Sequence, residues 1–376
     1  MRTERNHLGQ ALALGLAVLL SCGLEAAPKD CPPRKVLVGT LCRRFTGTPE
    51  VRAERAARLI DELAARARDQ YAGRRLDLVV LPEHALMREA KVAAEKTVPL
   101  AFVRAHLGAA ARRNGCYVAA GAILAECVDG RDCPRNALVL LDRTGAVAGV
   151  YNKVHTACAW GDPATRVSES GIAPGAGFPV FETDFGKVGF LVCFDMSYAD
   201  GWAELKRNGA EIVAVSSMSP QVFRPSLFAH EHQYWVVTAT PRSQAAVITP
   251  LGFVKEKVGD ESSLLTEIDL SYVMLHWSMQ LRGGKALADK FGAAAFGGIY
   301  EPGEDNGIFW SNRPDLPIGR MIEAINVRPR DDEAARAGRI CVHDTTDSPT
   351  RGLSICVQSR LVGRIVYDEA GRSTGD

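Results

Sequence analysis

The alternation of short apolar runs with amphipathic helical segments limits the fold more than any other feature of this sequence. The run at 76–82 is continuously apolar and bounded by charge and proline, which is typical of a strand buried on both faces. The segment behind Pro49 instead repeats its apolar residues at helical spacing. Strands that alternate with helices predict an α/β architecture, and a hairpin-like stretch at 245–258 predicts mixed sheets. The expected strands cover 35–41, 76–82, 117–126, 136–145, 146–152, 178–183, 187–195, 211–217, 245–254 and 262–270, and the expected helices cover 49–71, 99–115, 199–210 and 228–237.

Chain length and pattern together predict one large domain with an extension. The 376 residues have ordinary globular composition, 47% hydrophobic and 24% charged. We expect the domain to cover 35–275 and a C-terminal extension to cover 276–376, where the pattern loosens. The Gly- and Pro-rich connection at 161–177 is longer than most loops, which indicates a function for it.

The charge of the chain excludes one class of partner. The formal net charge is +1, and Lys and Arg are scattered among Asp and Glu rather than gathered into a stripe. Nucleic-acid binding therefore has no electrostatic basis here.

Residues 1–27 have the pattern of a signal peptide. Arg2 and Arg5 precede an apolar run, 8–23, that ends in small residues and is marginal in length for a membrane span. Its end also resembles a bacterial lipobox, in which Cys22 would carry a lipid anchor. Two outcomes stay open: a lipoprotein signal that ends before Cys22, or cleavage nearby that frees a soluble protein. Either predicts an exported protein, which is periplasmic, membrane-anchored by lipid, or secreted.

Ten cysteines agree with export, because thiols pair in oxidising compartments. Two pairs are symmetric about expected turns, which predicts hairpin disulfides between Cys127 and Cys133 and between Cys341 and Cys356. For the others outside the signal and the candidate nucleophile, disulfides and buried free thiols remain alternatives. These are Cys31, Cys42, Cys116 and Cys158.

Three apolar strands end abruptly in a reactive residue. They end at Glu83, Lys153 and Cys193. Each alone has an ordinary explanation, as a solvated charge or a small core residue. Because the carboxyl ends of strands in α/β sheets open onto one crevice, the three side chains are expected to converge.

The amino-acid sequence around these strand ends resembles that of the nitrilase superfamily of carbon-nitrogen hydrolases, whose triad is Glu, Lys and Cys. The matching segments are Leu81–Glu83, Tyr151–His155 and Gly189–Asp195, with further agreement at Ala229–Gln233. The likeness covers roughly residues 35 to 275. It implies a four-layer α-β-β-α sandwich, no cofactor or metal, a small-molecule amide substrate and frequent homo-oligomers.

The implied chemistry suits these residue types. A thiol needs a base to become a nucleophile, and Glu83 would take its proton. The Lys153 ammonium would stabilise the tetrahedral oxyanion, and Cys193 would carry a thioester until water released the acid.

Two further residues are expected to position the substrate. Glu169 would be a second glutamate of the kind that related amidases carry before the nucleophile, and Phe194 follows the nucleophile directly. The Phe194-Asp195 pair resembles the amidase branches and favours amides over nitriles. Together with the cysteines and the signal, it also resembles the exported biotinidase and vanin branch. Phe228 and Thr240 stand where the family usually has an arginine and an asparagine, and both replacements are expected to alter the substrate pocket.

Other functions are compatible with some of these residues. Metal binding at His230-Glu231-His232 is disfavoured, because helical residues two apart do not face one ligand. A Cys-His hydrolase that uses His155 or His84 would leave Glu83 and Lys153 unexplained. Nitrile hydrolysis, acyl transfer to an amine as in the apolipoprotein N-acyltransferases, and a non-catalytic exported binding protein remain alternatives.

Overall fold

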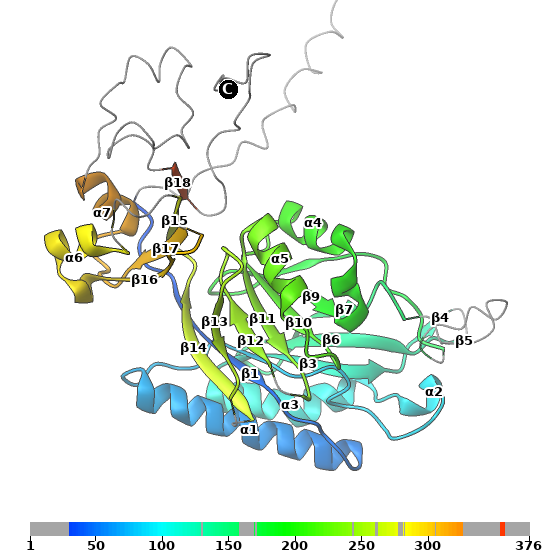
Figure 1. Ribbon diagram of the computed structural model, residues 1–376. Coiled ribbons are helices and arrows are strands. Elements are labelled where there is room, and N and C mark those ends of the chain that lie inside the picture. The colour runs from blue at the N-terminus through cyan, green and yellow to red at the C-terminus, as the bar shows by residue number, and fades with distance from the viewer. Residues whose placement is uncertain are drawn as a thin grey trace, which may run out of the picture.

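Two six-stranded sheets lie face to face, and helices cover their outer sides, as Figure 1 shows. The computed structural model describes residues 30–128, 131–157, 169, 171–242, 244–259, 262–276, 281, 283–304, 306–325 and 354–357, with backbone alone for 128, 131, 132, 276 and 354–357. Two facing sheets with helices on both outer sides confirm the predicted α/β class and the four-layer α-β-β-α sandwich.

The first sheet has the strand order β14-β1-β2-β3-β6-β7, and the second has β13-β12-β11-β10-β9-β8. The strands of the first are β1 (Lys35–Leu41), β2 (Leu78–Val80), β3 (Tyr117–Leu124), β6 (Arg135–Leu141), β7 (Val147–Asn152) and β14 (Ser263–Asp269). Those of the second are β8 (Val180–Glu182), β9 (Lys187–Val192), β10 (Ile212–Ser216), β11 (Trp235–Ala239), β12 (Ala246–Ile248) and β13 (Val254–Lys257). The helices are α1 (Pro49–Gln70), α2 (Ala93–Lys96), α3 (Leu100–Asn114), α4 (Ala199–Arg207) and α5 (Phe223–His232).

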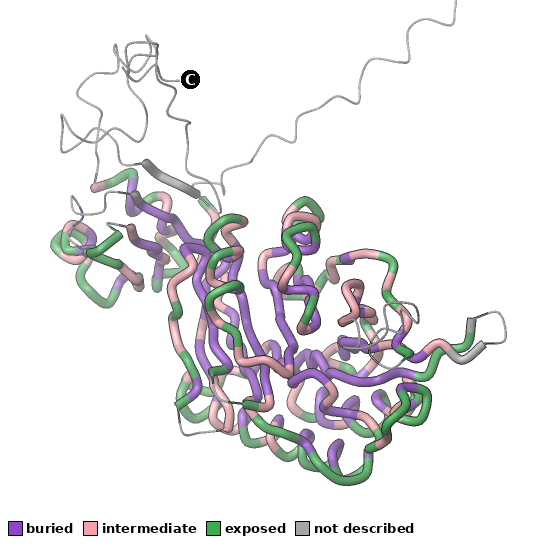
Figure 2. The backbone as a smooth tube through the Cα atoms, turned by 45° about the vertical axis from the view of Figure 1, so that its right-hand side comes forward, coloured by how far each residue is buried: buried purple, intermediate pink, exposed green. Residues whose placement is uncertain are grey.

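Alternation along β1 divides the buried core into two layers. Val36 and Val38 belong to the cluster between the sheets, whereas Leu37 and Leu41 belong to the cluster beneath α1 and α3. Successive side chains of a strand point to opposite faces, so one apolar run supplies both layers. Figure 2 shows the buried strands enclosed in this way, with exposed residues along the outer sides of the helices.

Local signals set the ends of the first helices. Pro49 opens α1, and the Thr48 side chain accepts a hydrogen bond from Val51 N at 3.5 Å. Gly115 ends α3 in the left-handed conformation, with φ of 60°. Both ends agree with the sequence prediction.

The prediction of a helix over 228–237 is wrong. Helix α5 ends at His232, Gln233 takes a left-handed φ of 57°, and the chain continues as the buried strand β11. The run from Trp235 to Ala239 is β-branched and fully buried, so pairing with β10 outweighs helical continuation.

The expected Cys127–Cys133 disulfide is absent, and both residues are free thiols. The short hairpin forms from β4 (Cys127–Val128) and β5 (Arg131–Asp132), but Cys127 lies opposite Asp132, so the register differs by one residue from the predicted one. Cys31, Cys42 and Cys116 are also free. Cys158, the Cys341–Cys356 pair, the 1–27 signal and Cys22 fall outside the residues whose side chains the structure describes.

The C-terminal part adds a small sheet with its own apolar cluster. Its strand order is β16-β17-β15-β18. The elements are β15 (Tyr272–His276), α6 (Lys285–Phe291), the short helix η3 (Ala293–Ala295), β16 (Phe296–Glu301), β17 (Asn306–Ser311), α7 (Ile318–Ile325) and β18 (Ser354–Val357). The expected boundary at 276 thus falls at the end of β15.

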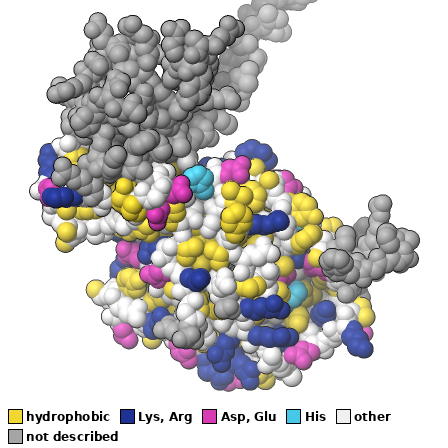
Figure 3. All heavy atoms as spheres, viewed as in Figure 1, with side chains coloured by type: hydrophobic (Ala, Val, Ile, Leu, Met, Phe, Trp, Pro, Cys, Tyr) yellow, Lys and Arg dark blue, Asp and Glu magenta, His cyan; other side chains and the backbone are white. Residues whose placement is uncertain are grey.

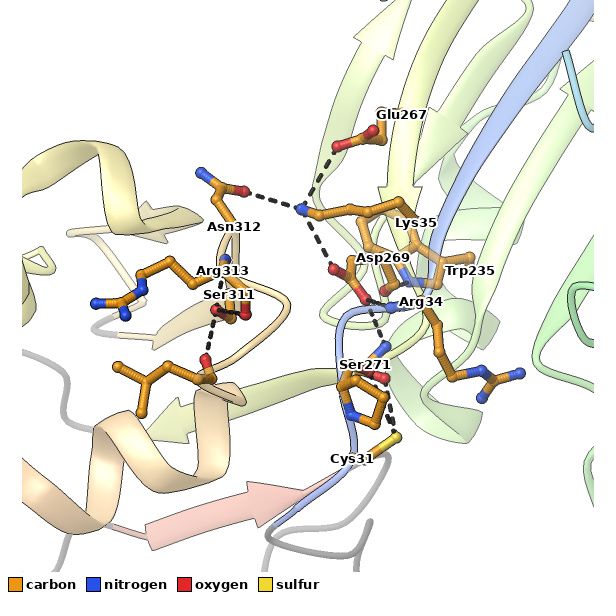
Figure 4. Close-up of polar contacts among 12 residues, drawn as sticks. Cys31, Arg34, Lys35, Trp235, Glu267, Asp269, Ser271, Ser311, Asn312 and Arg313 are labelled. Carbon is orange, nitrogen blue, oxygen red and sulfur yellow. Dashed lines mark hydrogen bonds and ion pairs between the residues drawn. The ribbon is translucent and has the colours of Figure 1, made fainter. Parts of the chain in front are cut away.

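Lys35 links this sheet to the sandwich, as Figure 4 shows. Its Nζ atom donates to Asn312 Oδ1 at 2.9 Å and lies 3.2 Å from Asp269 Oδ2. Nζ also stands 5.5 Å from the centre of the Trp310 ring, which packs edge-on against Trp235.

Charged side chains of both signs interleave on the face drawn in Figure 3. None of the helices in the described ranges has both the length and the apolarity needed to cross a bilayer.

Candidate active site

The three predicted strand ends meet between the two sheets. Strands β2 and β7 point the same way in the first sheet, so Glu83 and Lys153 emerge at one edge of it. Cys193 follows β9 of the second sheet and opens the short helix η1 (Cys193–Ser197). Facing sheets, rather than one sheet, therefore bring the side chains together.

Lys153 joins two carboxylates inside the site. Its Nζ atom lies 3.4 Å from Glu83 Oε1, and it also forms an ion pair with Glu169 Oε1. The side chains of Lys153 and Glu83 are each only 2% exposed. Burial alone would lower the pKa of Lys153, but the two carboxylates raise it above its ordinary value. The lysine is therefore an ammonium over the working pH range.

The Cys193 thiol is held in its protonated form. Burial first, and then the charge of Glu83, raise its pKa to about 11, against the opposing effect of Lys153 and of a hydrogen bond with Ser217. Its backbone has a φ of 47°, a strained conformation for a residue with a side chain. Such strain is found where a site requires one particular side-chain direction.

Glu83 is held as a carboxylate. Burial acts to raise its pKa, but His84 and Lys153, together with hydrogen bonds from Asn136 and the Met218 backbone, bring the pKa below its ordinary value. The Met218 N–H donates to Oε2 at 2.8 Å. A deprotonated carboxylate beside a protonated thiol can accept the thiol proton.

Asn136 holds the two glutamates in place, and sequence reasoning missed it. It is buried at the start of β6, and its Nδ2 donates to Glu83 Oε1 at 2.8 Å and to Glu169 Oε2 at 3.2 Å. The available signal was a polar residue that opens an otherwise apolar run, because buried amides are almost always hydrogen-bonded.

Glu169 lies where the sequence predicted, beside the lysine. Besides its contact with Lys153, its Oε1 accepts a hydrogen bond from Ala157 N at 3.0 Å. Its backbone φ is 42°. Residues 158–168 and 170, its neighbours in the long connection, are not described.

Asp195 ties the lysine segment to the nucleophile segment. This fully buried carboxylate accepts hydrogen bonds from the Tyr151 hydroxyl at 2.7 Å and from Val192 N at 2.9 Å. His155 N donates to its other oxygen at 2.6 Å, and Val154 N does so at 3.2 Å. The sequence resemblance included Asp195 but assigned it no such structural role.

The side chains of Phe194, His155 and His84 lie beside this network. The Phe194 ring is partly exposed and packs edge-on against Tyr198. His155 Nε2 contacts Asp200 at 2.9 Å, and His84 Nε2 stands 3.7 Å from Glu83 Oε1. The described contacts therefore give neither imidazole a bond to Cys193, and substrate positioning by Phe194 stays a prediction.

The proposed metal alternative gains no support from the geometry of α5. His230 Nδ1 lies 3.1 Å from the Leu251 carbonyl oxygen, whereas the His232 ring stacks on Phe228. In the described ranges, no three His, Cys, Asp or Glu side chains are grouped as metal ligands.

Comparison with known proteins finds one family with which most of the chain is similar. The family profile described as carbon-nitrogen hydrolase matches residues 46–275. The chain is 26% identical over 188 residues to omega-amidase NIT2-A of Xenopus laevis, covering 44% of this chain and 66% of that protein. It is 33% identical over 86 residues to a citrullinase of Francisella tularensis, covering 23% and 28%. The matches thus cover less than two thirds of these relatives.

Solved structures share the fold at low identity. A carbon-nitrogen hydrolase from Helicobacter pylori superposes with a TM-score of 0.51 at 20% identity, covering 63% of this chain and 90% of that one. Nit3 of Saccharomyces cerevisiae, described as a member of branch 10 of the nitrilase superfamily, gives 0.52 at 18% identity, covering 65% and 92%.

Proposed function

Because this chain belongs to the carbon-nitrogen hydrolase family, the nitrilase superfamily, we propose that it hydrolyses a linear amide through a thioester on Cys193. The observation that carries the proposal is the buried group in which Lys153 contacts both Glu83 and Glu169, with Cys193 beside Glu83. That group supplies a nucleophile, a base and a cation in one place.

The first half of the reaction forms the thioester. Glu83 takes the Cys193 proton as the sulfur attacks the amide carbon, and the Lys153 ammonium stabilises the negative oxygen that results. The carbon–nitrogen bond then breaks, and the Glu83 proton passes to the departing amine.

The second half releases the acid. Water attacks the thioester carbon and gives one proton to Glu83, after which the carbon–sulfur bond breaks. The proton returns to the sulfur, which restores the thiol. Glu169 and Asn136 act as positioning residues, since they hold Lys153 and Glu83 by direct contacts.

Amides are proposed over nitriles for two reasons. The first is that Phe194-Asp195, directly after the nucleophile, resembles the amidase branches. The second is that two of the similar proteins, an omega-amidase and a citrullinase, have names that do not refer to nitriles. The biotinidase and vanin likeness stays a weaker prediction.

The test is release of ammonia from a panel of linear amides and nitriles. We expect turnover of amides by the wild-type protein and none by Cys193→Ala. Adding an amine acceptor and following the products by mass spectrometry separates hydrolysis from acyl transfer. Amide turnover that survives in Cys193→Ala would overturn the proposal, and failure of wild type on every compound would favour the binding-protein alternative.

Export is also part of the proposal. It rests on the signal-like residues 1–27, and a lipid anchor at Cys22 and a homo-oligomer remain predictions. The mass of the mature N-terminus, measured on protein from the native host, separates an acylated Cys22 from a soluble form.

A further inference from the structure

Ser217 lies beside the nucleophile at the end of the second sheet. Strands β9 and β10 are parallel neighbours, with Val192 opposite Ser216 (Figure 1). Cys193 and Ser217 each follow by one residue, so the register places them side by side where the two strands end. The Ser217 N–H donates to Ala239 O at 2.9 Å, which continues the pairing of β10 with β11 by one residue. The backbone of Ser217 is therefore fixed by the sheet.

The surroundings of the Ser217 hydroxyl set the direction of its single hydrogen. The residue is buried, and its Oγ accepts a hydrogen bond from Ser219 N at 2.9 Å. A serine hydroxyl carries one hydrogen and two lone pairs, so it can donate only once. It is hydrogen-bonded to the Cys193 side chain, and the thiol is in turn hydrogen-bonded to Glu83. The thiol hydrogen thus points to the carboxylate, and the hydroxyl hydrogen points to the sulfur.

One short turn contacts both groups that exchange the proton. Ser217 contacts the sulfur, and the next residue, Met218, donates its N–H to Glu83 Oε2 at 2.8 Å. Departure of the thiol proton leaves a negative charge on the sulfur. Hydrogen bonds to an ionised acceptor are roughly twice as strong as those to a neutral one. The contact with Ser217 therefore strengthens as the proton moves to Glu83.

We propose that Ser217 is a further catalytic residue, whose hydroxyl stabilises the negative charge on the Cys193 sulfur. The inference rests on the proposed function, because it concerns the same reaction. In the first half, the hydroxyl stabilises the sulfur while Glu83 takes the thiol proton. In the second half, the carbon–sulfur bond breaks and its electron pair returns to the sulfur, which Ser217 stabilises again. Ser217 keeps its own proton throughout.

The pH dependence of Cys193 alkylation tests the proposal apart from turnover. Glu83→Gln serves as the background, because it removes the carboxylate that raises the thiol pKa and leaves Lys153 and Ser217 lowering it. Adding Ser217→Ala should shift the pH profile of alkylation by iodoacetamide upward by about one pH unit, as expected for a lost hydrogen bond to an ionised group. Mass spectrometry of the Cys193 peptide follows the reaction.

Turnover gives a second readout. In otherwise wild-type protein, Ser217→Ala should lower kcat for a linear amide by about tenfold and leave KM nearly unchanged, because the sulfur carries charge only during the reaction. Ser217→Thr keeps the hydroxyl and should restore most of this loss.

The matched control is Ser311→Ala. Ser311 forms the same kind of turn in the C-terminal sheet, where its buried Oγ accepts from Arg313 N at 2.9 Å. This variant should change neither the alkylation profile nor kcat. If Ser217→Ala left the position of the profile unchanged, or only slowed alkylation by one factor at every pH, Ser217 would merely close its turn and the proposal would be overturned. Should the wild type turn over no amide, the proposed hydrolysis would fail, while the alkylation profiles would still decide the role of Ser217.

Discussion

At the scale of single residues, the site is defined by how protons are divided between two acids. The pKa of Glu83 lies below its ordinary value, and burial with the charge of Glu83 raises the pKa of Cys193 to about 11. The free enzyme therefore holds a carboxylate and a neutral thiol, not a thiolate ion pair of the kind that many cysteine hydrolases use. Substrate must arrive before the proton moves, which limits damage to the thiol by oxidation.

Glu83→Gln should separate turnover from thiol reactivity. Removing the negative charge leaves burial and Lys153 acting on Cys193, so the thiol pKa falls and alkylation by iodoacetamide at pH 8 becomes faster. Amide kcat/KM should fall by about 10²–10⁴-fold because the general base is lost. Intact mass spectrometry follows the alkylation, and ammonia release follows turnover.

The control for this change is Glu54→Gln, on the exposed surface of α1. It should change neither rate. If Glu83→Gln kept its turnover, or slowed alkylation, the base would have to be another group, and His84 beside Glu83 would become the first candidate.

At the scale of elements, close packing between β3 and the segment after β2 places Glu83. A Cβ atom on Gly121 would lie 2.3 Å from the Pro82 carbonyl oxygen and 3.0 Å from Glu83 Cα. Gly121→Ala should therefore displace the base, lowering turnover at least tenfold and the free energy of unfolding by about 1–3 kcal/mol. Activity assays and urea unfolding measure the two effects.

Gly259→Ala is the matched change. A Cβ atom there meets nothing within 4 Å, so neither activity nor stability should change beyond about 0.5 kcal/mol. Equal behaviour of the two variants would mean that the contact with Pro82 does not position the base.

Strands and reactive strand ends could be predicted because their signals are local. The apolar runs of β1 and β2, Pro49 of α1 and Gly115 after α3 act within a few residues. The end of α5 could not be predicted, since a run of apolar residues fits a buried helix and a buried strand equally well, and pairing with β10 decides between them.

The roles of the supporting residues of the site could not be predicted from the sequence for a different reason. Asn136 and Asp195 matter through partners that are 53 and 44 residues away in the chain, Glu83 and Tyr151. Such contacts follow from the packing of two sheets, which no local pattern encodes. The register of the 127–132 hairpin, and with it the missing disulfide, likewise depends on a shift of one residue.

At the scale of the whole molecule, Lys35 joins the sandwich to the C-terminal sheet. Asp269, whose side chain is fully buried, has its pKa raised by burial, with Lys35 acting in the opposite direction. Lys35→Gln should lower the free energy of unfolding by about 1–3 kcal/mol at neutral pH, after allowance for the partial exposure of the lysine. It would also remove the charge over the Trp310 ring.

The sign of the pH dependence follows from the carboxylate. Without Lys35 the folded-state pKa of Asp269 rises further, so the variant binds more protons than the wild type as pH falls. The stability deficit should be larger at pH 7.5 than at pH 4.5, because the raised pKa lets more of Asp269 take up a proton at the lower pH, and a protonated Asp269 needs no counter-charge. Urea unfolding at the two pH values measures this, with Lys187→Gln on the exposed Lys187–Glu182 pair as control. A deficit that grows in acid would contradict the assignment.

The covalent state of Cys193 during turnover tests the central claim most directly. Wild type and Cys193→Ala are mixed with a linear amide, quenched in acid within the first turnovers, and examined by intact and peptide mass spectrometry. The account predicts an acyl adduct on the Cys193 peptide of the wild type alone, lost as the acid appears. Turnover without that adduct, or an adduct that persists in Cys193→Ala, would contradict it.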